Sequence, residues 1–259
     1  EQGFLLADIV AYGDLKHRDA LLKQTEGYAS GYRNHLRLGG YKIFLDGSPQ
    51  GKPAWLSRPY EGETYQGYPI YTDDQVRSFT ETACRDRRQL LVHCNGDAAC
   101  EQLLRCWPGK TDLRPVMIHA QTVRIDQLER MKTIGMMPSF FTAHTYYWGD
   151  VHRKNLGEER AARISPAASA LRLGLPFTFH QDTPVLEPNM LDTVQRAVCR
   201  ETRSGFVLGN DEKISVYDAL RAVTYWGAYQ YFEEDRKGTP TEGKLADLVL
   251  LDRGPCRVS

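Results

Sequence analysis

Histidine, aspartate and lysine side chains stand at or near the ends of several short apolar runs. His93 ends the run "LLVH", His119 ends "PVMIH" and His180 ends "PFTFH". Asp182 follows His180 by two residues, and Lys42 opens "KIFLDG". Imidazoles and carboxylates are the ligands that hold a hydrolytic Zn²⁺ and leave one position open for water. A lysine buried beside them is hard to explain by packing, because an unpaired ammonium group is expensive to bury. These residue types predict a metal-assisted hydrolytic site.

Each of these residues also has an ordinary structural interpretation. A single histidine at a strand end is often a hydrogen-bonded rim or core residue. Asp182 precedes Thr183-Pro184 and could be a turn residue, and Lys42 could extend its ammonium group to solvent. The metal interpretation gains weight from the set, because the same residue types recur at the ends of successive runs. His180 and Asp182 are two residues apart, so on a strand they would share a face.

The apolar runs alternate with amphipathic stretches, which predicts strands separated by helices. We expect strands at 5–12, 41–45, 89–93, 115–119, 135–139 and 176–180. Helices are expected in "TDDQVRSFTETACRDR", capped by Thr72, in "VRIDQLERMKTIG", ended by Gly135, and in "ISVYDALRAVTYWGAYQYFE", the longest pattern, capped by Ser215. The alternation predicts an α/β fold with a parallel sheet. Since parallel strands end at the same edge, the polar residues at the run ends should converge.

Two segments interrupt this alternation, and we expect both to be long irregular loops. Residues 46–69 are rich in Gly, Pro and Tyr, and residues 141–157 carry Tyr, Trp and His. Both follow the carboxyl end of an expected strand, where long loops are usually functional. Their aromatic rings could line a roomy pocket for an apolar substituent, or could simply pack the loops together.

Composition narrows the classes of partner. Thirty-three basic residues balance thirty-three acidic ones, so no net field attracts nucleic acid or an anionic membrane, and neither is expected as a partner. The six cysteines form no C-x-x-C pair, which favours free thiols, a reducing and therefore cytoplasmic location, and no cysteine zinc site. Neither a phosphate-binding P-loop nor a G-x-S-x-G motif is present.

Several stretches, taken in order, resemble one family. They are "GGYKIFLDGSPQGKPAW", "LLVHCNGDAACEQLL", "RPVMIHAQTV", "PSFFTAHTYYWGD", "FHQDTPVLEPNMLDTVQRAVCRET" and "GKLADLVLLD". The chain is thereby identified as similar to the amidohydrolase superfamily, in the amidohydrolase-3 branch that includes N-substituted formamide deformylase. The resemblance implies a (β/α)8 TIM-type barrel joined to a small β-sandwich. It also implies one or two divalent metal ions, with zinc expected first.

The resemblance assigns roles residue by residue. His93 and His119 look like metal ligands, and Asp182 looks like a ligand that also acts as the catalytic base. Lys42 matches a lysine that can be carboxylated and bridge two metals. Three further residues match positions near the substrate: Asp46, His144 and His180.

One departure from the family pattern affects the expected extent of the chain. The family places a His-x-His pair at the end of the first barrel strand, and no two of the seven histidines here have that spacing. Six strand-like runs also fall short of an eight-stranded barrel. We therefore expect an incomplete barrel, strands 3–8, over residues 1–235. Residues 236–259 are expected to enter the small β-sandwich, and the chain is interpreted as a C-terminal fragment.

The resemblance predicts a hydrolase that acts on a non-peptide C–N bond, such as an amide or formamide, by metal-activated water with Asp182 as general base. The partner is expected to be a small amide-like substrate, and a homodimer is expected. One alternative is a truncated barrel that has lost catalysis, or a binding protein. Another is a lactone or phosphotriester hydrolase on the same scaffold.

Overall fold

A single parallel sheet forms the centre of the computed structural model, which describes residues 5–255. Its strands are β1 (Ile9–Asp14), β2 (Leu36–Phe44), β3 (Gln89–Cys94), β4 (Val116–His119), β5 (Met137–Phe140) and β6 (Thr178–Phe179). Each strand pairs in parallel with the next in sequence, so the order is β1-β2-β3-β4-β5-β6. The six strands confirm the expected α/β class and match an incomplete (β/α)8 barrel.

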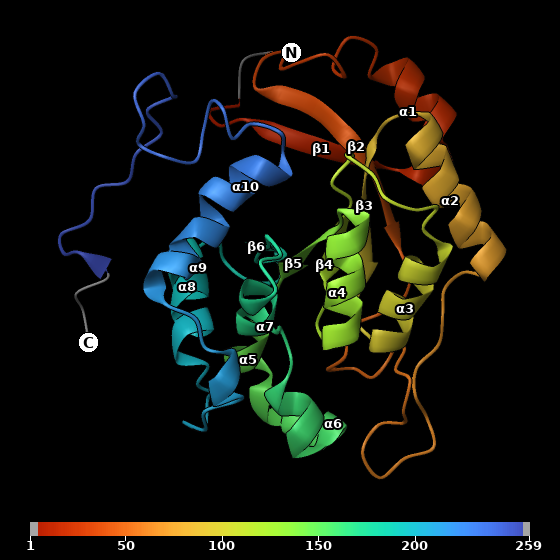
Figure 1. Ribbon diagram of the computed structural model, residues 1–259, viewed down its shortest axis with the longest axis vertical. Coiled ribbons are helices and arrows are strands. Elements are labelled where there is room, and N and C mark those ends of the chain that lie inside the picture. The colour runs from red at the N-terminus through yellow and green to blue at the C-terminus, as the bar shows by residue number, and fades with distance from the viewer. Residues whose placement is uncertain (1–4, 256–259) are drawn as a thin grey trace.

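Helices surround the curled sheet, with α2–α4 and α8–α10 on opposite sides of Figure 1. The α-helices of the described residues are α1 (Arg18–Gln24), α2 (Asp73–Arg85), α3 (Asp97–Cys106), α4 (Ile125–Ile134), α5 (His144–Tyr147), α6 (Gly149–Ala162), α7 (Ala167–Arg172), α8 (Met190–Cys199), α9 (Val216–Val223) and α10 (Tyr225–Gln230). Two short 3₁₀-helices cover Leu15–His17 and Asn210–Glu212.

Local capping signals explain where several helices begin and end. Thr72 and Gln75 form a reciprocal capping box at the start of α2. Gly135 ends α4 with a φ of 87°, a left-handed conformation that glycine adopts at little cost. The Ser215 side chain accepts a hydrogen bond from the backbone of Asp218 and so caps α9. All three predicted caps are confirmed.

Two predictions of local structure are wrong. Residues 141–157 are largely helical, because they contain α5 and most of α6. Among the buried positions of α5 and α6 in this segment only Leu156 is a large apolar residue, so hydrophobic periodicity could not reveal the helices. The long pattern after Ser215 is two helices, since Thr224 between α9 and α10 has non-helical φ and ψ of −121° and −86°. Residues 46–69 form the expected irregular loop.

The two faces of the sheet bury different residues. Leu90 and Val92 of β3 belong to the main core, which the sheet shares with the surrounding helices. Leu91, between them, packs with Val116, Ile118 and Met137 in a smaller cluster on the opposite, inner face. His93 follows Leu91 by two residues and therefore lies on this inner face. The inner face thus carries a packed floor beneath the carboxyl ends of the strands.

The C-terminal segment, drawn in blue in Figure 1, extends away from the helices. No strand occurs in the described part of it, residues 236–255. Entry of this segment into a β-sandwich, and the boundary after residue 235, stay predictions.

Candidate active site

Three histidines from different strands meet at the carboxyl edge of the sheet. His93 lies near the end of β3, His119 ends β4, and His180 follows β6. Nε2 of His119 lies 3.0 Å from Nδ1 of His93, and Nε2 of His180 lies 3.0 Å from Nδ1 of His119. The ring centroids of the two pairs are 4.5 Å and 4.8 Å apart. The structure therefore brings all three rings into one chain of hydrogen bonds.

Asn95 sets the direction of this chain. Its Nδ2 donates a hydrogen bond to the carbonyl of Gly47 at 3.1 Å, which identifies that atom as the amide nitrogen. The same nitrogen lies 3.0 Å from Nε2 of His93. Since the amide nitrogen only donates, Nε2 of His93 must accept, and the proton of a neutral His93 ring lies on Nδ1.

The remaining rings follow from that starting point. Nδ1–H of His93 donates to His119, and Nδ1–H of His119 in turn donates to His180. Nδ1 of His180 lies 3.0 Å from the hydroxyl of Ser139, which accepts the last hydrogen bond. Every ring nitrogen of the three histidines therefore has a partner while the rings are neutral.

Burial keeps these rings neutral. It lowers the pKa of His93 to about 4 and that of His180 to about 3, with a further lowering by the nearby positive charge of Lys42. Burial and the neighbouring histidines also lower the pKa of His119 well below its usual 6.5. Neutral imidazoles are the form that binds metal ions.

Lys42 and Asp182 lie within electrostatic reach of each other beside the three rings. Burial lowers the pKa of Lys42 to about 8, and the carboxylate of Asp182 opposes that shift. Surrounding atoms desolvate Asp182 and raise its pKa above 3.8, although the residue reaches solvent. Asp182 and His119 have positive φ angles of 53° and 69°. Such conformations cost energy in non-glycine residues and cluster at functional sites.

The donor chemistry of this group fits a divalent metal, because it combines neutral imidazoles, a carboxylate and a lysine that deprotonates readily. Within residues 5–255, however, no three His, Cys, Asp or Glu side chains are arranged to hold an ion together. In this arrangement Nε2 of His119 and Nδ1 of His93 are hydrogen-bonded to each other. Breaking that hydrogen bond would free the lone pair on Nε2 of His119, whereas Nδ1 of His93 could bind a metal only after giving up its proton.

Asp46 holds the backbone next to His93 in place. Its buried carboxylate accepts hydrogen bonds from the backbone N–H groups of Trp55, Asn95 and Gly96, at 2.7–2.9 Å. One oxygen lies 3.7 Å from Nε2 of His93. Asp46 thus ties the loop after β2 to the turn after β3, and its expected role in binding substrate stays a prediction.

His144 lies at the start of α5 and near the three strand-end histidines. Its ring packs edge-on against Phe141, which also lies 5.2 Å from the ring of His180. Burial lowers the pKa of His144 well below 6.5, with further lowering by the neighbouring His152 and His180. His144 is the fourth imidazole of the site, and its Nδ1 lies 2.9 Å from Nε2 of His152.

Three residues that contact the site were not predicted as site residues from the sequence. They are Asn95, Ser139 and His152, each in contact with a ring of the site. Asn95 could have been found from its position two residues after His93. Ser139 could have been found as an inner-face residue at the end of β5. No regular helical spacing links His144 and His152, because α5 and α6 are separate helices.

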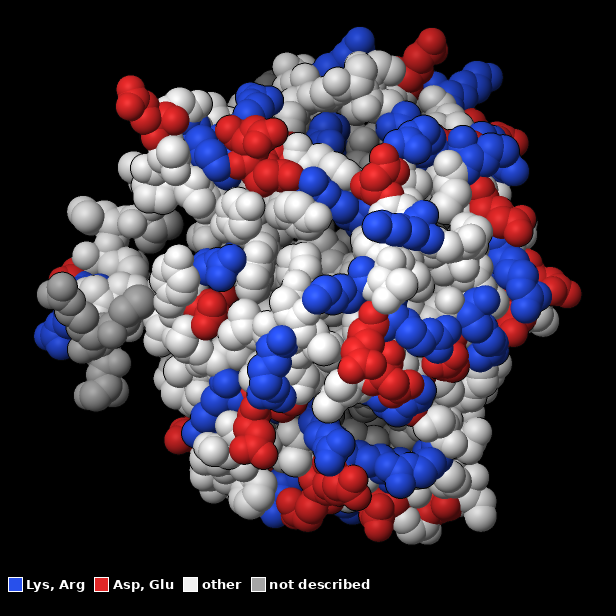
Figure 2. Space-filling view, viewed as in Figure 1, with Lys and Arg blue, Asp and Glu red and all other residues white. Residues whose placement is uncertain are grey.

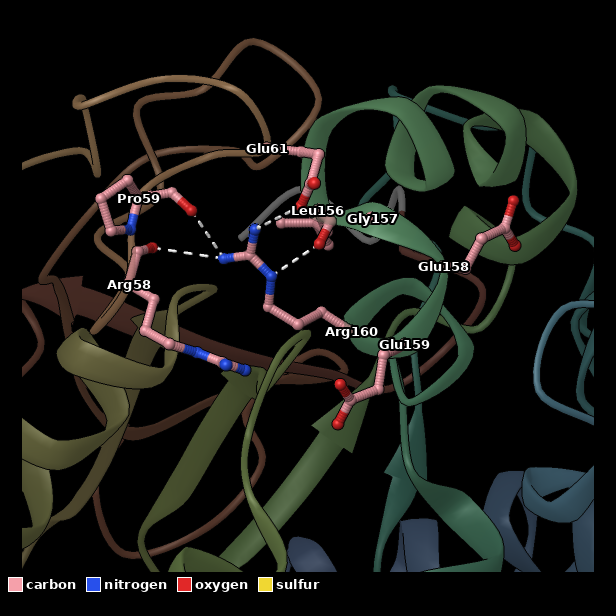
Figure 3. A pocket seen from close by; sticks show the side chains of 8 residues that line it. All are labelled: Arg58, Pro59, Glu61, Leu156, Gly157, Glu158, Glu159 and Arg160. Carbon is pink, nitrogen blue, oxygen red and sulfur yellow. Dashed lines mark hydrogen bonds and ion pairs between the residues drawn. The ribbon is translucent and has the colours of Figure 1, made fainter.

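A cavity of about 400 Å³ lies between the 46–69 loop and α6, and its lining is shown in Figure 3. Arg160 crosses it and donates hydrogen bonds to the carbonyls of Leu156, Arg58 and Pro59. The predicted site residues do not line this cavity. Nη2 of Arg160 also lies 3.6 Å from the carboxylate of Glu61, so we interpret the arginine as an anchor that holds the loop to α6.

Some aromatic rings of the two segments pack against other parts of the protein. Tyr60 is buried, donates to the carbonyl of Ala54 and stacks near Tyr65. Tyr146 lies against the guanidinium of Arg196, 3.6 Å from its ring centre. These contacts favour the packing interpretation for these rings.

Positive and negative side chains are mixed over the face shown in Figure 2. The described helices are too short and too polar to cross a membrane.

The sequence pattern of the amidohydrolase family matches residues 3–259, nearly the whole chain. The chain belongs to the amidohydrolase family. Its strand-end histidines lie at the carboxyl edge of the parallel sheet, the edge at which TIM-type barrels carry their active sites.

Individual relatives agree with this assignment. The amidohydrolase YtcJ of Bacillus subtilis is 26% identical over 231 residues, 85% of this chain and 43% of the relative. The N-substituted formamide deformylase of Arthrobacter pascens is 27% identical over 227 residues, 85% of this chain and 42% of that enzyme. An uncharacterized metal-dependent hydrolase from Pyrococcus furiosus superposes with a TM-score of 0.84 at 26% identity, over 99% of this chain and 53% of that structure. The chain therefore spans less than half the length of these two relatives.

Proposed function

We propose that this chain forms the catalytic part of a metal-dependent hydrolase that cleaves a non-peptide C–N bond in a small amide or formamide. The observation that carries the proposal is the meeting of His93, His119 and His180, all kept neutral by burial, beside Lys42 and Asp182. Similarity to a formamide deformylase supports the choice of bond.

The proposed metal ligands are His93, His119, Asp182 and Lys42, the last as a carboxylated side chain, and zinc is the proposed metal. When bound, such a metal supplies Lewis-acid polarisation of water and of the substrate carbonyl. A lysine whose pKa is near 8 loses its proton easily, and only the neutral amine can take up CO₂. Carboxylation would also replace a costly buried cation with an anion that binds metal.

Asp182 is proposed as the general base that accepts the proton of the attacking water. Its raised pKa makes the carboxylate a better proton acceptor than an ordinary aspartate. Once protonated, Asp182 can deliver the proton to the leaving nitrogen. His144 is proposed to donate a hydrogen bond to the oxygen on which negative charge develops. His180 and Asp46 are proposed to border the substrate.

The test combines a substrate panel with two aspartate variants of the intact protein. N-substituted formamides, acetamides and N-acyl amino acids are compared with lactones and phosphotriesters. Asp182→Asn should lower kcat by roughly 10²–10⁴-fold. Asp74→Asn is the matched control, because Asp74 is an exposed helix residue paired with Arg77, and it should leave the rate unchanged. Full amide hydrolysis by Asp182→Asn would remove the proposed base, and turnover of only esters would overturn the bond assignment.

Homodimer formation and a cytoplasmic location stay predictions, because nothing in the described structure bears on them.

A further inference from the structure

His144 and His152 form a buried pair at the junction of α5 and α6. Nδ1 of His144 lies 2.9 Å from Nε2 of His152, and the two rings stack with their planes 19° apart. The side chains are 3% and 0% exposed, so water does not compete with this hydrogen bond. Burial lowers the pKa of both rings, that of His152 to about 4. Each ring therefore carries a single ring proton near neutral pH.

The other nitrogen of His152 decides where these protons lie. Nδ1 of His152 is buried and has no hydrogen-bond partner among the described residues. If Nδ1 carried the proton, an N–H group would be buried without an acceptor, which native proteins rarely tolerate. A bare nitrogen lone pair is the less costly arrangement. The proton of His152 is therefore on Nε2, from which it donates to His144.

This assignment fixes the state of His144. Its Nδ1 accepts the bond from His152, so its single proton must lie on Nε2. No described residue forms a hydrogen bond with that Nε2. The ring of Phe141 lies 4.7 Å from that of His144 and 5.2 Å from that of His180, which places His144 beside the strand-end histidines. His144 can therefore present an N–H donor to a ligand at the strand ends.

We propose that His152 is a positioning residue that holds His144 as an Nε2–H donor toward the oxygen of the substrate that becomes negatively charged. The role in the reaction rests on the proposed hydrolase function, whereas the proton assignment stands on the geometry of the pair alone.

The proton assignment is tested by NMR of the intact protein labelled with ¹⁵N in its histidine rings. Ring-nitrogen shifts distinguish a protonated nitrogen from a bare one, and the single variants of His144 and His152 assign the signals. The expected result is a bare Nδ1 and a protonated Nε2 on His144, with a protonated Nε2 on His152. A proton on Nδ1 of His144 would overturn the proposal. This measurement needs no turnover, so it decides the question even if the hydrolase function fails.

Kinetics of three variants test the role in catalysis. His152→Phe keeps a ring of similar size but removes the donor, and it should lower kcat by about 10–100-fold with little change in KM. His152→Gln offers an amide N–H to His144 and should recover much of the rate. Leu156→Ala is the matched control, because it disturbs buried packing of the same helix without touching His144.

Two results would overturn the role. One is an unchanged kcat in His152→Phe, and the other is an equal loss of kcat in His152→Phe and Leu156→Ala. If His152→Phe does not fold, failure of His152→Gln to retain more activity than a His144→Phe variant would also overturn it.

Discussion

Nε2 of His119 reaches Nδ1 of His93, 3.0 Å away on the neighbouring strand, because the backbone of His119 is left-handed. Regular alternation along β4 would place His119 on the side of Met117, which packs in the main core, and not on the inner side with Ile118. A φ of 69° at the last residue of the strand breaks that alternation. The left-handed backbone of His119 thus directs its ring toward the other two histidines.

Asp46 should be a stability residue whatever its part in binding. Asp46→Asn replaces one acceptor oxygen with an NH₂ group that faces backbone N–H donors, so at least one buried donor loses its partner. We expect the free energy of unfolding to fall by about 2 kcal/mol or more, measured by denaturant titration. Asp112→Asn, at an exposed and solvent-screened ion pair, should lower the free energy of unfolding far less. Equal stability of the two variants would contradict the stabilising role of Asp46.

His152 should make the protein sensitive to acid. Its pKa is about 4 in the folded protein and 6.5 when exposed, so the unfolded chain takes up a proton first as the pH falls. The stability due to the neutral ring is complete above pH 6.5 and is lost between pH 6.5 and about 4. This loss amounts to about 3 kcal/mol. Denaturant titrations across this range should therefore show a smaller loss for His152→Phe than for the wild type. Parallel curves for the two proteins would mean that His152 is not kept neutral by burial.

Lys42 should take up CO₂. With a pKa of about 8, roughly a tenth of its amine is neutral at pH 7, far more than for an exposed lysine. Intact protein incubated with ¹³C-bicarbonate and zinc should show a carbamate ¹³C signal that Lys42→Arg abolishes. Lys52→Arg, in the 46–69 loop, should retain the signal, since Lys52 lies away from the three histidines and pairs with Glu63. A signal that survives in Lys42→Arg would assign the carbamate elsewhere.

The order and direction of the strands could be predicted from sequence because their signals are local. Apolar runs of strand length, the cap at Thr72 and the stop at Gly135 each act within a few residues. Strand boundaries were less accurate: β1 begins at Ile9 and ends at Asp14, whereas residues 5–12 were expected.

The helices of residues 141–157 could not be predicted, because most of their buried side chains are small or polar rather than apolar. Gly149, His152 and Asn155 of α6 are buried at helical spacing, yet none of them contributes to a hydrophobic pattern. Their burial depends on contacts with residues distant in sequence. The Thr202 side chain, for example, packs so closely against Gly149 that a side chain on Gly149 would collide with it.

The site was predictable in its residue types but not in its contacts. The predicted strand ends correctly placed His93, His119 and His180 at the carboxyl edge of the sheet. Their chain of hydrogen bonds depends on the backbone reversal at His119 and on Asn95 and Ser139, and none of these has a signature in a single sequence.

The central claim is that His93 and His119 jointly bind a divalent metal, and a direct binding measurement tests it best. Zn²⁺ is titrated calorimetrically into the intact apo-protein, its His93→Ala and His119→Ala variants, and His17→Ala as an exposed control. We predict that each site variant weakens binding by about 100-fold or more, while the control binds as the wild type does. Wild-type affinity in both site variants would contradict the account, because the metal would then be held by other residues.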